Sequence, residues 1–261
     1  MTVRLLTATE EINSFIAALD EKPEHTVSIH QLRNGVAKVW IIGKPDNFQA
    51  AVVQWLGLLE EPIAFGEDAA AIWKILKIVE GWDVFEVSMS VARELSLLVY
   101  GELRCEIRHY EDVFYLLDNP PKNMPSYDIS ITVRLLNEAD VDMVKAREST
   151  ATPIILKSIE DTLRHAVVAG AVLDGKLLGF AESRAADKYV ELGVHVDEEW
   201  RKKGLATAMA GLLIRHYQTR DLKVTWSTGD DNIASQRVAE KLGFHEIFRR
   251  VYVIPRRDKK V

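Results

Sequence analysis

Polar side chains recur at every second position in the run from Tyr189 to Val196. Apolar residues there alternate with Tyr189, Glu191, Gly193 and His195. This alternation predicts a β-strand with one apolar face and one polar face. Glu191 is the first candidate for a general base on the polar face, because burial raises the pKa of a carboxyl group toward neutral pH. A solvated glutamate at the surface is the alternative.

Two further side chains are candidates for the same role. Glu182 lies in the preceding apolar run and is the second choice, acting through a water molecule. His195 carries an imidazole, whose unperturbed pKa of about 6.5 lies close to neutral pH. Because His195 borders the acidic turn at residues 197–199, a surface ion pair is the favoured interpretation of this residue.

A basic loop and the start of a predicted helix follow this strand. They comprise Arg201, Lys202, Lys203, Gly204, Leu205, Ala206 and Thr207. The first amides of a helix lack intrahelical acceptors, the helix dipole favours negative charge, and a glycine lets an anion approach the backbone. The loop therefore predicts a phosphate site, although it is neither a Walker loop nor a G-x-G-x-x-G motif. The alternative is a solvated basic helix start.

The elements that must position these residues belong to an α+β chain with a mixed sheet. Two apolar runs, at residues 167–172 and 177–183, flank Asp174-Gly175, which is a strong hairpin signal. Beyond the basic loop we expect a helix at 205–217, a strand at 222–227, a helix at 233–242 and a strand at 246–254.

A short repeat indicates that this arrangement occurs twice. Residues 2–6 and 132–136 share the sequence TVRLL, and an acidic, helix-starting segment follows each. The first half then shows a helix at 67–79, a strand at 84–87, a helix at 91–100 and two strand-like runs near Ile107 and Phe114. The proline-rich segment 118–126 predicts a linker. We therefore expect two domains, at residues 1–121 and 129–261.

Composition and charge narrow the possible functions. The chain has 261 residues, 48% of them hydrophobic, and a net charge of −6, which argues against nucleic-acid binding driven by overall positive charge. Residues 1–121 carry 10 Lys and Arg against 19 Asp and Glu, whereas residues 122–261 carry 23 against 20. The single cysteine, Cys105, stands in a strand-like pattern at 103–107 and excludes an internal disulfide. No signal peptide or membrane span is predicted, so we expect a cytoplasmic protein. No metal site is predicted, and the expected assembly is a monomer or a homodimer.

Two motifs in the second half resemble a known family. The segment Arg201-Lys202-Lys203-Gly204-Leu205-Ala206 resembles the Arg/Gln-x-x-Gly-x-Gly/Ala motif of the GNAT superfamily of acyl-CoA-dependent N-acyltransferases. About thirty residues later, the segment 231–244 resembles the second signature of the superfamily, an Asn-led helix that ends in Lys-Leu-Gly-Phe. The resemblance covers residues 129–261 and implies a tandem GNAT-like acyltransferase fold with a degenerate N-terminal lobe.

The resemblance implies a binding site for acetyl-CoA as co-substrate. The amides of the loop from Arg201 to Thr207 would hold the CoA pyrophosphate, and the backbone of Val194, His195 and Val196 would lie along the pantetheine arm. Asn232 and Ser235 would lie beside that arm near the thioester. An ordinary helix N-cap is the alternative for Asn232.

The resemblance also shows one departure in the catalytic residues. Many members of the family carry a tyrosine general acid where this chain has Ala239. Ser235, one turn earlier, is the substitute that we expect to protonate the thiolate, with Tyr189 and Tyr217 as alternatives. The amide of Val196 is the expected oxyanion donor.

The sequence thus predicts an N-acetyltransferase that transfers an acetyl group from acetyl-CoA to a primary amine on a small molecule or a peptide N-terminus, by direct attack on the thioester. Its first lobe would complete or cover the acceptor site. A two-lobed glycine-type N-acyltransferase with bulkier acyl groups and a catalytically silent CoA-binding regulatory module are the alternatives. No nucleic acid or membrane is expected as a partner.

Overall fold

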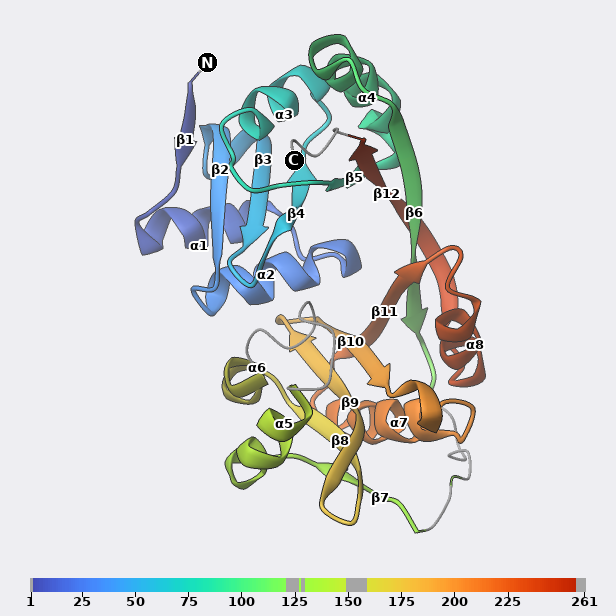
Figure 1. Cartoon of the computed structure of the whole chain (residues 1–261). Coiled ribbons are helices and arrows are strands. Elements are labelled where there is room, and N and C mark those ends of the chain that lie inside the picture. The colour runs from blue at the N-terminus through green and yellow to red at the C-terminus, as the bar shows by residue number, and fades with distance from the viewer. Residues whose placement is uncertain (1, 121–126, 128–129, 149–158, 257–261) are drawn as a thin grey trace. The chain divides into compact units, whose positions relative to one another are not determined.

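The computed structural model describes residues 2–120, 127, 130–148 and 159–256. These residues form two compact units (Figure 1). The first contains the described residues up to Val113 together with those from Phe248 onward, and the second runs from Phe114 to Ile247. The predicted domains, 1–121 and 129–261, are each continuous in sequence. The first compact unit, in contrast, combines residues from both ends of the chain. Most of the predicted linker, at residues 121–126, lies outside the described residues.

The first unit is a sheet with helices. Its elements are β1 (Val3–Leu5), α1 (Thr9–Ala18), η1 (Pro23–His25), α2 (Thr26–Arg33), β2 (Ala37–Lys44), β3 (Asn47–Trp55), β4 (Leu58–Phe65), α3 (Ala69–Leu76), β5 (Phe85–Ser88), α4 (Met89–Leu103) and the start of β6 (Ile107–Leu117). The strands follow the order β1-β2-β3-β4-β5, and β12 adjoins β5. A core of buried aliphatic and aromatic side chains lies between the sheet and helices α3 and α4.

The second unit repeats this plan. Its elements are β7 (Thr132–Leu135), η2 (Glu138–Asp140), α5 (Val141–Glu148), α6 (Ile159–His165), β8 (Val168–Leu173), β9 (Lys176–Ala185), β10 (Tyr189–Val196), η3 (Glu198–Trp200), α7 (Leu205–Gln218), β11 (Lys223–Gly229), α8 (Ile233–Lys241) and the start of β12 (His245–Pro255). The strands follow the order β7-β8-β9-β10-β11, and β6 adjoins β11. In both units the first four strands are antiparallel, and the fourth and fifth strands run parallel.

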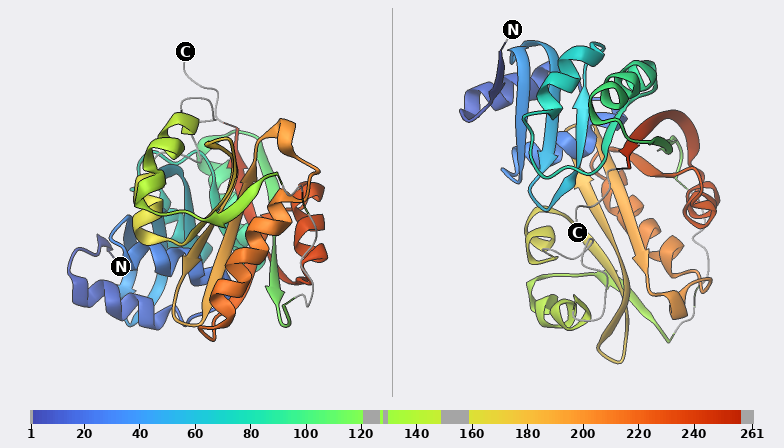
Figure 2. Two further views of the ribbon diagram at one scale, coloured as in Figure 1. Left: turned by 90° about the horizontal axis from the view of Figure 1, so that it is seen from below. Right: turned by 45° about the horizontal axis from the view of Figure 1, so that its top comes forward.

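Helices cover both faces of the second sheet (Figure 2). Ser183 on β9 shares a hydrogen bond of 2.7 Å with Tyr217 of α7, whereas Phe180 on the same strand packs with Val144 of α5. Because Phe180 and Ser183 differ by an odd number of positions, they point to opposite faces. Helix α7 therefore covers one face, and α5 covers the other.

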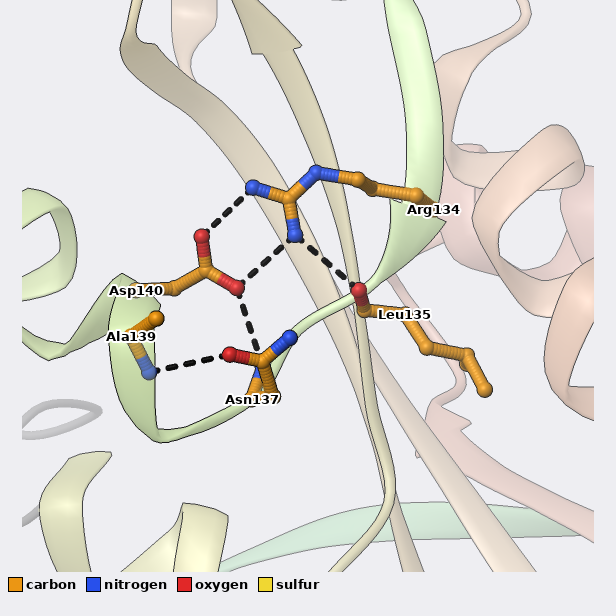
Figure 3. Close-up of polar contacts among 5 residues, drawn as sticks. All are labelled: Arg134, Leu135, Asn137, Ala139 and Asp140. Carbon is orange, nitrogen blue, oxygen red and sulfur yellow. Dashed lines mark hydrogen bonds and ion pairs between the residues drawn. The ribbon is translucent and has the colours of Figure 1, made fainter.

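The repeated TVRLL segments begin corresponding strands. Arg134 of β7 donates two hydrogen bonds to Asp140, of 2.8 and 2.5 Å, and the Asp140 carboxylate also accepts from the amide of Asn137 (Figure 3). This network fixes the turn from β7 into α5. The matching residue Arg4 makes a single 2.5 Å contact with Glu11. The repeat thus marks the same strand in both units, with a stronger turn in the second.

Two sequence predictions were wrong. The strand-like runs near Ile107 and Phe114 form one continuous strand, β6, because no turn residue separates them. The pattern at 103–107 is not a strand: α4 ends at Leu103, Arg104 takes a left-handed conformation with φ of 54°, and Cys105 lies half-buried in the turn before β6. None of the helices in the described part of the chain is long and apolar enough to cross a membrane.

Candidate active site

The parallel strands β10 and β11 separate part-way along their length. They pair from Tyr189 with Lys223 to Leu192 with Trp226, and in the described residues the pairing ends there. Both strands continue, β10 to Val196 and β11 to Gly229. We call the point beyond the Leu192–Trp226 pair the fork.

The free edge of β10 beyond the fork exposes backbone polar groups. The carbonyl of Tyr189 accepts from the amide of Ala186, and the amide of Asp197 donates to Leu178. Odd-numbered residues of β10 thus direct their backbone groups toward β9. Val194 and Val196 therefore direct theirs toward the side from which β11 has separated. His195 points its backbone toward β9, so of the three predicted pantetheine residues only the two valines face the fork.

The loop after β10 leads directly to the start of α7. Gly204 precedes the helix with φ of 80°, and no side chain caps the helix there. Lys202 also has a positive φ, of 62°. Left-handed residues next to right-handed ones turn successive amides toward a common point, which suits an anion. Leu205 and Thr207 are buried and anchor this end of the helix in the core.

The basic side chains of the loop have different local partners. Arg201 folds back and donates from Nε to the carbonyl of Val196 at 3.2 Å. The ammonium of Lys203 lies 4.1 Å from the ring centre of Trp200. Arg201, Lys202 and Lys203 are all exposed, so their positive charges surround the start of the helix without blocking it.

Glu191 is a buried carboxylate beside the fork. Only 5% of its surface is exposed, so the alternative of a solvated glutamate was wrong. The hydroxyl of Ser227, the first residue of β11 beyond the fork, donates to Oε1 of Glu191 at 3.1 Å.

Glu182 lies on the same face as Glu191. In the antiparallel register Glu182 faces Gly193, and Arg184 faces Glu191. Arg184 donates a hydrogen bond from Nη2 to Glu182, and its Nη1 lies 3.9 Å from Oε1 of Glu191. One guanidinium thus contacts both candidate bases.

His195 is farther along the same face. Its Nε2 lies 3.9 Å from Oδ1 of Asp197, the acidic neighbour with which the sequence analysis favoured a surface ion pair, and the contact is an ion pair only when the imidazole is protonated. The ring also stacks on Phe180 with 6.0 Å between ring centres. These contacts direct His195 toward the strand end rather than toward Glu191.

Helix α8 brings the second motif to the fork. The side chain of Asn232 accepts a hydrogen bond of 3.2 Å from the amide of Ser235, so Asn232 is the N-cap of α8, as the alternative interpretation had it. The Ser235 hydroxyl accepts from the indole N–H of Trp226 at 3.0 Å. Trp226 and Glu191 lie on opposite faces of the sheet, because Trp226 pairs with Leu192. Ser235 and Glu191 therefore approach the fork from opposite faces.

A strand fork, a glycine-led helix start and an Asn-capped helix occur here together within residues 189–241. Residues 133–244 match the model of the acetyltransferase (GNAT) family. This segment is a GNAT-family domain. No curated protein sequence matches the chain significantly. GNAT domains use acyl-CoA as co-substrate, and within the described residues no cluster of three or more His, Cys, Asp or Glu side chains could hold a metal.

Solved structures resemble the chain along almost its whole length. A Drosophila protein is 13% identical to this chain, and the match spans 97% of this chain and 98% of the Drosophila chain, with a TM-score of 0.74. A GCN5-related N-acetyltransferase-like protein from Streptococcus suis is 17% identical over 96% and 100% of the two chains, with a TM-score of 0.66. A tandem GNAT protein from the clavulanic acid biosynthesis pathway is 14% identical over 97% and 98%, with a TM-score of 0.61. At these identities the likeness shows the fold, and the predicted tandem GNAT-like fold is confirmed.

The first unit has the same plan as the GNAT domain but differs from it at the corresponding helix start and strand edge. The loop between β4 and α3 is short, and the carboxylate of Asp68 caps α3 by accepting from the amide of Ala71 at 2.9 Å. Across β4 and β5, Arg250 of β12 bonds the buried Glu86 and donates to the carbonyl of Ala64 at 2.9 Å. The chain's own side chains thus occupy the helix start and the strand edge, which accounts for the missing motifs.

The sequence analysis missed three residues of the site. Arg184, Ser227 and Trp226 each contact a predicted catalytic side chain. Arg184 follows Glu182 by two positions but lies one residue beyond the predicted strand at 177–183, and the strand in fact continues to Ala185, which places the pair on one face. Ser227 and Trp226 carried no such signal, because the register between β10 and β11 brings Ser227 to Glu191, and the packing of α8 on β11 brings Ser235 to Trp226.

The candidates for the thiolate acid lie in different surroundings in the GNAT domain. Ala239 is fully buried in α8 and offers no polar group. The hydroxyl of Tyr217 bonds Ser183 inside the α7 packing face, and burial raises the pKa of this phenol. Ser235, half-buried and next to Trp226, is therefore the hydroxyl best placed at the fork.

Proposed function

We propose that this protein is a cytoplasmic N-acyltransferase that passes an acyl group, acetyl by default, from its CoA thioester to a primary amine on a small molecule or a peptide N-terminus. The observation that carries the proposal is the fork between β10 and β11, directly ahead of the glycine-led start of α7. A thioester arm entering the fork meets backbone groups on one side and free helix amides at its phosphate end.

Each part of the co-substrate has a counterpart in the GNAT domain. The amides between Arg201 and Thr207 hold the pyrophosphate, whose charge the exposed Lys202 and Lys203 balance. The backbone of Val194 and Val196 pairs with the pantetheine arm as an added strand. The arm shares the Val196 carbonyl with Arg201, because a carbonyl oxygen accepts two hydrogen bonds.

The chemical step is direct attack of the amine on the thioester. The nitrogen–carbon bond forms as the carbon–sulfur bond breaks, Glu191 takes one proton from the nitrogen, and Ser235 passes one to the sulfur. Glu191 then releases its proton to solvent, and Ser235 regains a proton from solvent, so that both groups return to their starting state. The amide of Val196 stabilises the oxyanion. Glu191 and Ser235 lie on opposite faces at the fork, which keeps the entering amine and the leaving thiolate apart.

A catalytically silent CoA-binding module is the second candidate. The observation that favours it is Ala239, which is buried and has no proton to give where many relatives have a tyrosine. Such a module binds acetyl-CoA as an enzyme does but turns over no acceptor.

The first experiment is calorimetric titration of acetyl-CoA into the wild type and Gly204→Glu, with the fold of the variant checked by circular dichroism. We expect micromolar binding that only the variant loses, because glutamate places a negative charge at the phosphate site. Unchanged affinity in a folded variant would refute the phosphate-loop assignment, and absent binding to the wild type would refute the proposal.

An acceptor screen then separates the remaining possibilities. Thiol release is measured with acetyl-, benzoyl- and phenylacetyl-CoA against a broad panel of amines and peptides. Faster release from the aromatic donors would identify the glycine-type N-acyltransferase. Binding without release on the whole panel, together with no effect of Glu191→Gln, would identify the silent module.

A further inference from the structure

Three charged side chains of the GNAT domain form one group beside the fork. Arg184 hydrogen-bonds Glu182 and lies 3.9 Å from Glu191, which is itself held by Ser227. The group of Glu182, Arg184 and Glu191, called the carboxylate group below, has a net charge of −1 when all three are ionised. The activity proposed above does not by itself explain why a guanidinium lies between two candidate bases.

Gly193 marks the position of this arrangement on β10. A Cβ on Gly193 would lie 3.4 Å from Oε1 and 3.5 Å from Cγ of Glu182, and 3.8 Å from Nη2 of Arg184. The Glu182–Arg184 pair therefore lies over Gly193, the first residue of β10 beyond the fork. The pair and the fork meet at the same residue.

The two carboxylates differ in their partners and their burial. Glu182 accepts a charge-assisted hydrogen bond from Arg184, and its side chain is 13% exposed. Glu191 accepts a neutral hydrogen bond from Ser227, and its side chain is 6% exposed. The cation is therefore at hydrogen-bond distance from Glu182, whereas it lies 3.9 Å from Glu191, whose hydrogen-bond donor is a neutral hydroxyl.

We propose that Arg184 is a positioning residue that divides the roles of the two carboxylates. It fixes Glu182 as a permanent counter-ion and leaves Glu191 as the proton acceptor, so that the amine substrate binds to the carboxylate group as an ammonium. This inference rests on the proposed function and adds to it the charge of the acceptor and the choice between two bases.

The proton balance follows from this division of roles. Glu191 takes one proton from the ammonium, and the freed lone pair attacks the thioester carbon. The carbon–sulfur bond breaks, the second proton leaves the nitrogen and ends on the sulfur, and Glu191 releases its proton to solvent. Glu182 and Arg184 keep their charges throughout.

The elements that pack with β9 and β10 carry other ionisable side chains, which stay unchanged in the test. They are Tyr189 and His195 on β10, Lys223 on β11, Asp142 and Lys145 on α5, which packs on β9, and Arg215, His216 and Tyr217 on α7, on the opposite face. Because they are common to all variants, differences between pH profiles report the carboxylate group.

The test is the pH profile of kcat/KM in four variants, with fold and acetyl-CoA affinity measured for each. The acid limb is the part of the profile where kcat/KM falls as the pH is lowered. In Arg184→Gln two carboxylates lose their shared cation, so the acid limb moves to higher pH by about one unit. In Glu182→Gln the guanidinium faces Glu191 alone, so the limb moves to lower pH and kcat falls about tenfold. The double variant restores the net charge of −1, so its limb returns toward the wild-type position. Arg184→Lys keeps the charge and therefore keeps the limb.

The outcomes separate this inference from the proposed function. A wild type that binds acetyl-CoA but acylates no amine would overturn the proposed function itself. An active wild type whose single variants lose activity equally at every pH, with the acid limb fixed, would show that Arg184 is only structural. An equal rate with a neutral isostere of the acceptor would contradict binding of the ammonium form.

Discussion

The hydroxyl of Ser227 donates a hydrogen bond to Oε1 of Glu191 across 3.1 Å, which joins the first residue of β11 beyond the fork to the buried carboxylate on β10. The contact links the geometry of the fork to the protonation of the candidate base. A buried carboxylate without a hydrogen-bond donor is costly, so this serine offsets part of the cost of burying Glu191.

Ser227→Ala is expected to destabilise the protein by about 1–3 kcal/mol, because it leaves a buried carboxylate oxygen short of a donor. The matched control is Ser90→Ala, which removes an exposed hydrogen bond of 2.7 Å to Glu67. Urea denaturation of both variants is the measurement. Equal losses would mean that the Ser227 contact contributes no more than a surface bond does.

Gly204→Ala is expected to cost about 1 kcal/mol of stability and to weaken acetyl-CoA binding, because alanine disfavours φ of 80°. Gly175→Ala in the β8–β9 turn is the control, since its φ is 72° and no atom lies within 4 Å of an added Cβ. The control shares the stability loss but keeps full affinity in calorimetry. Weakened binding in both variants would contradict a local role of Gly204.

Arg134→Gln is expected to destabilise the second unit by about 1–2 kcal/mol, because Arg134 donates two hydrogen bonds to the mostly buried Asp140 (Figure 3). The matched variant Arg4→Gln, in the other copy of the repeat, removes an exposed contact and is expected to cost less than about 1 kcal/mol. Thermal unfolding of both variants tests the difference. A larger loss of stability in Arg4→Gln than in Arg134→Gln would contradict the stronger role given to Arg134.

Asp68→Ala is expected to lose about 1 kcal/mol, because the carboxylate caps α3. The hydrogen bond from Ala71 lowers the pKa of Asp68 in the folded state. Its contribution is therefore complete above the unfolded pKa of about 3.9 and is lost as the pH falls through the lower folded value. Asp68→Asn keeps the cap and removes this pH dependence.

Denaturation at pH 7 and at pH 3 measures the Asp68 contribution. We expect the wild type and Asp68→Ala to differ less at pH 3 than at pH 7, and Asp68→Asn to change by a smaller amount. A difference between wild type and Asp68→Ala that stays constant with pH would show that the charge of Asp68 has no part in the cap.

Much of the fold was predictable because it depends on local patterns. The strand at Tyr189–Val196 and the helix starts at Leu205 and Ile233 appear where alternation, glycine and the Asp-Asn pair predicted them. The repeat at residues 2–6 and 132–136 was predicted to begin each half, and it contains the first strand of each unit. The prediction was wrong at residues 103–107. Their sequence alternates as in a strand, but α4 ends at Leu103 and Arg104 takes a left-handed conformation.

The sequence by itself determined the residues of the phosphate loop, the polar face that carries Glu191 and the likeness to the GNAT family, because motifs and strand alternation are properties of neighbouring residues. Only the tertiary structure decided which groups those residues meet. The register of β9 brought Arg184 to Glu191, the register of β11 brought Ser227 to Glu191, and the packing of α8 on β11 brought Ser235 to Trp226. Pairing between strands depends on packing across the whole sheet, and a shift of one residue would send each side chain to the other face.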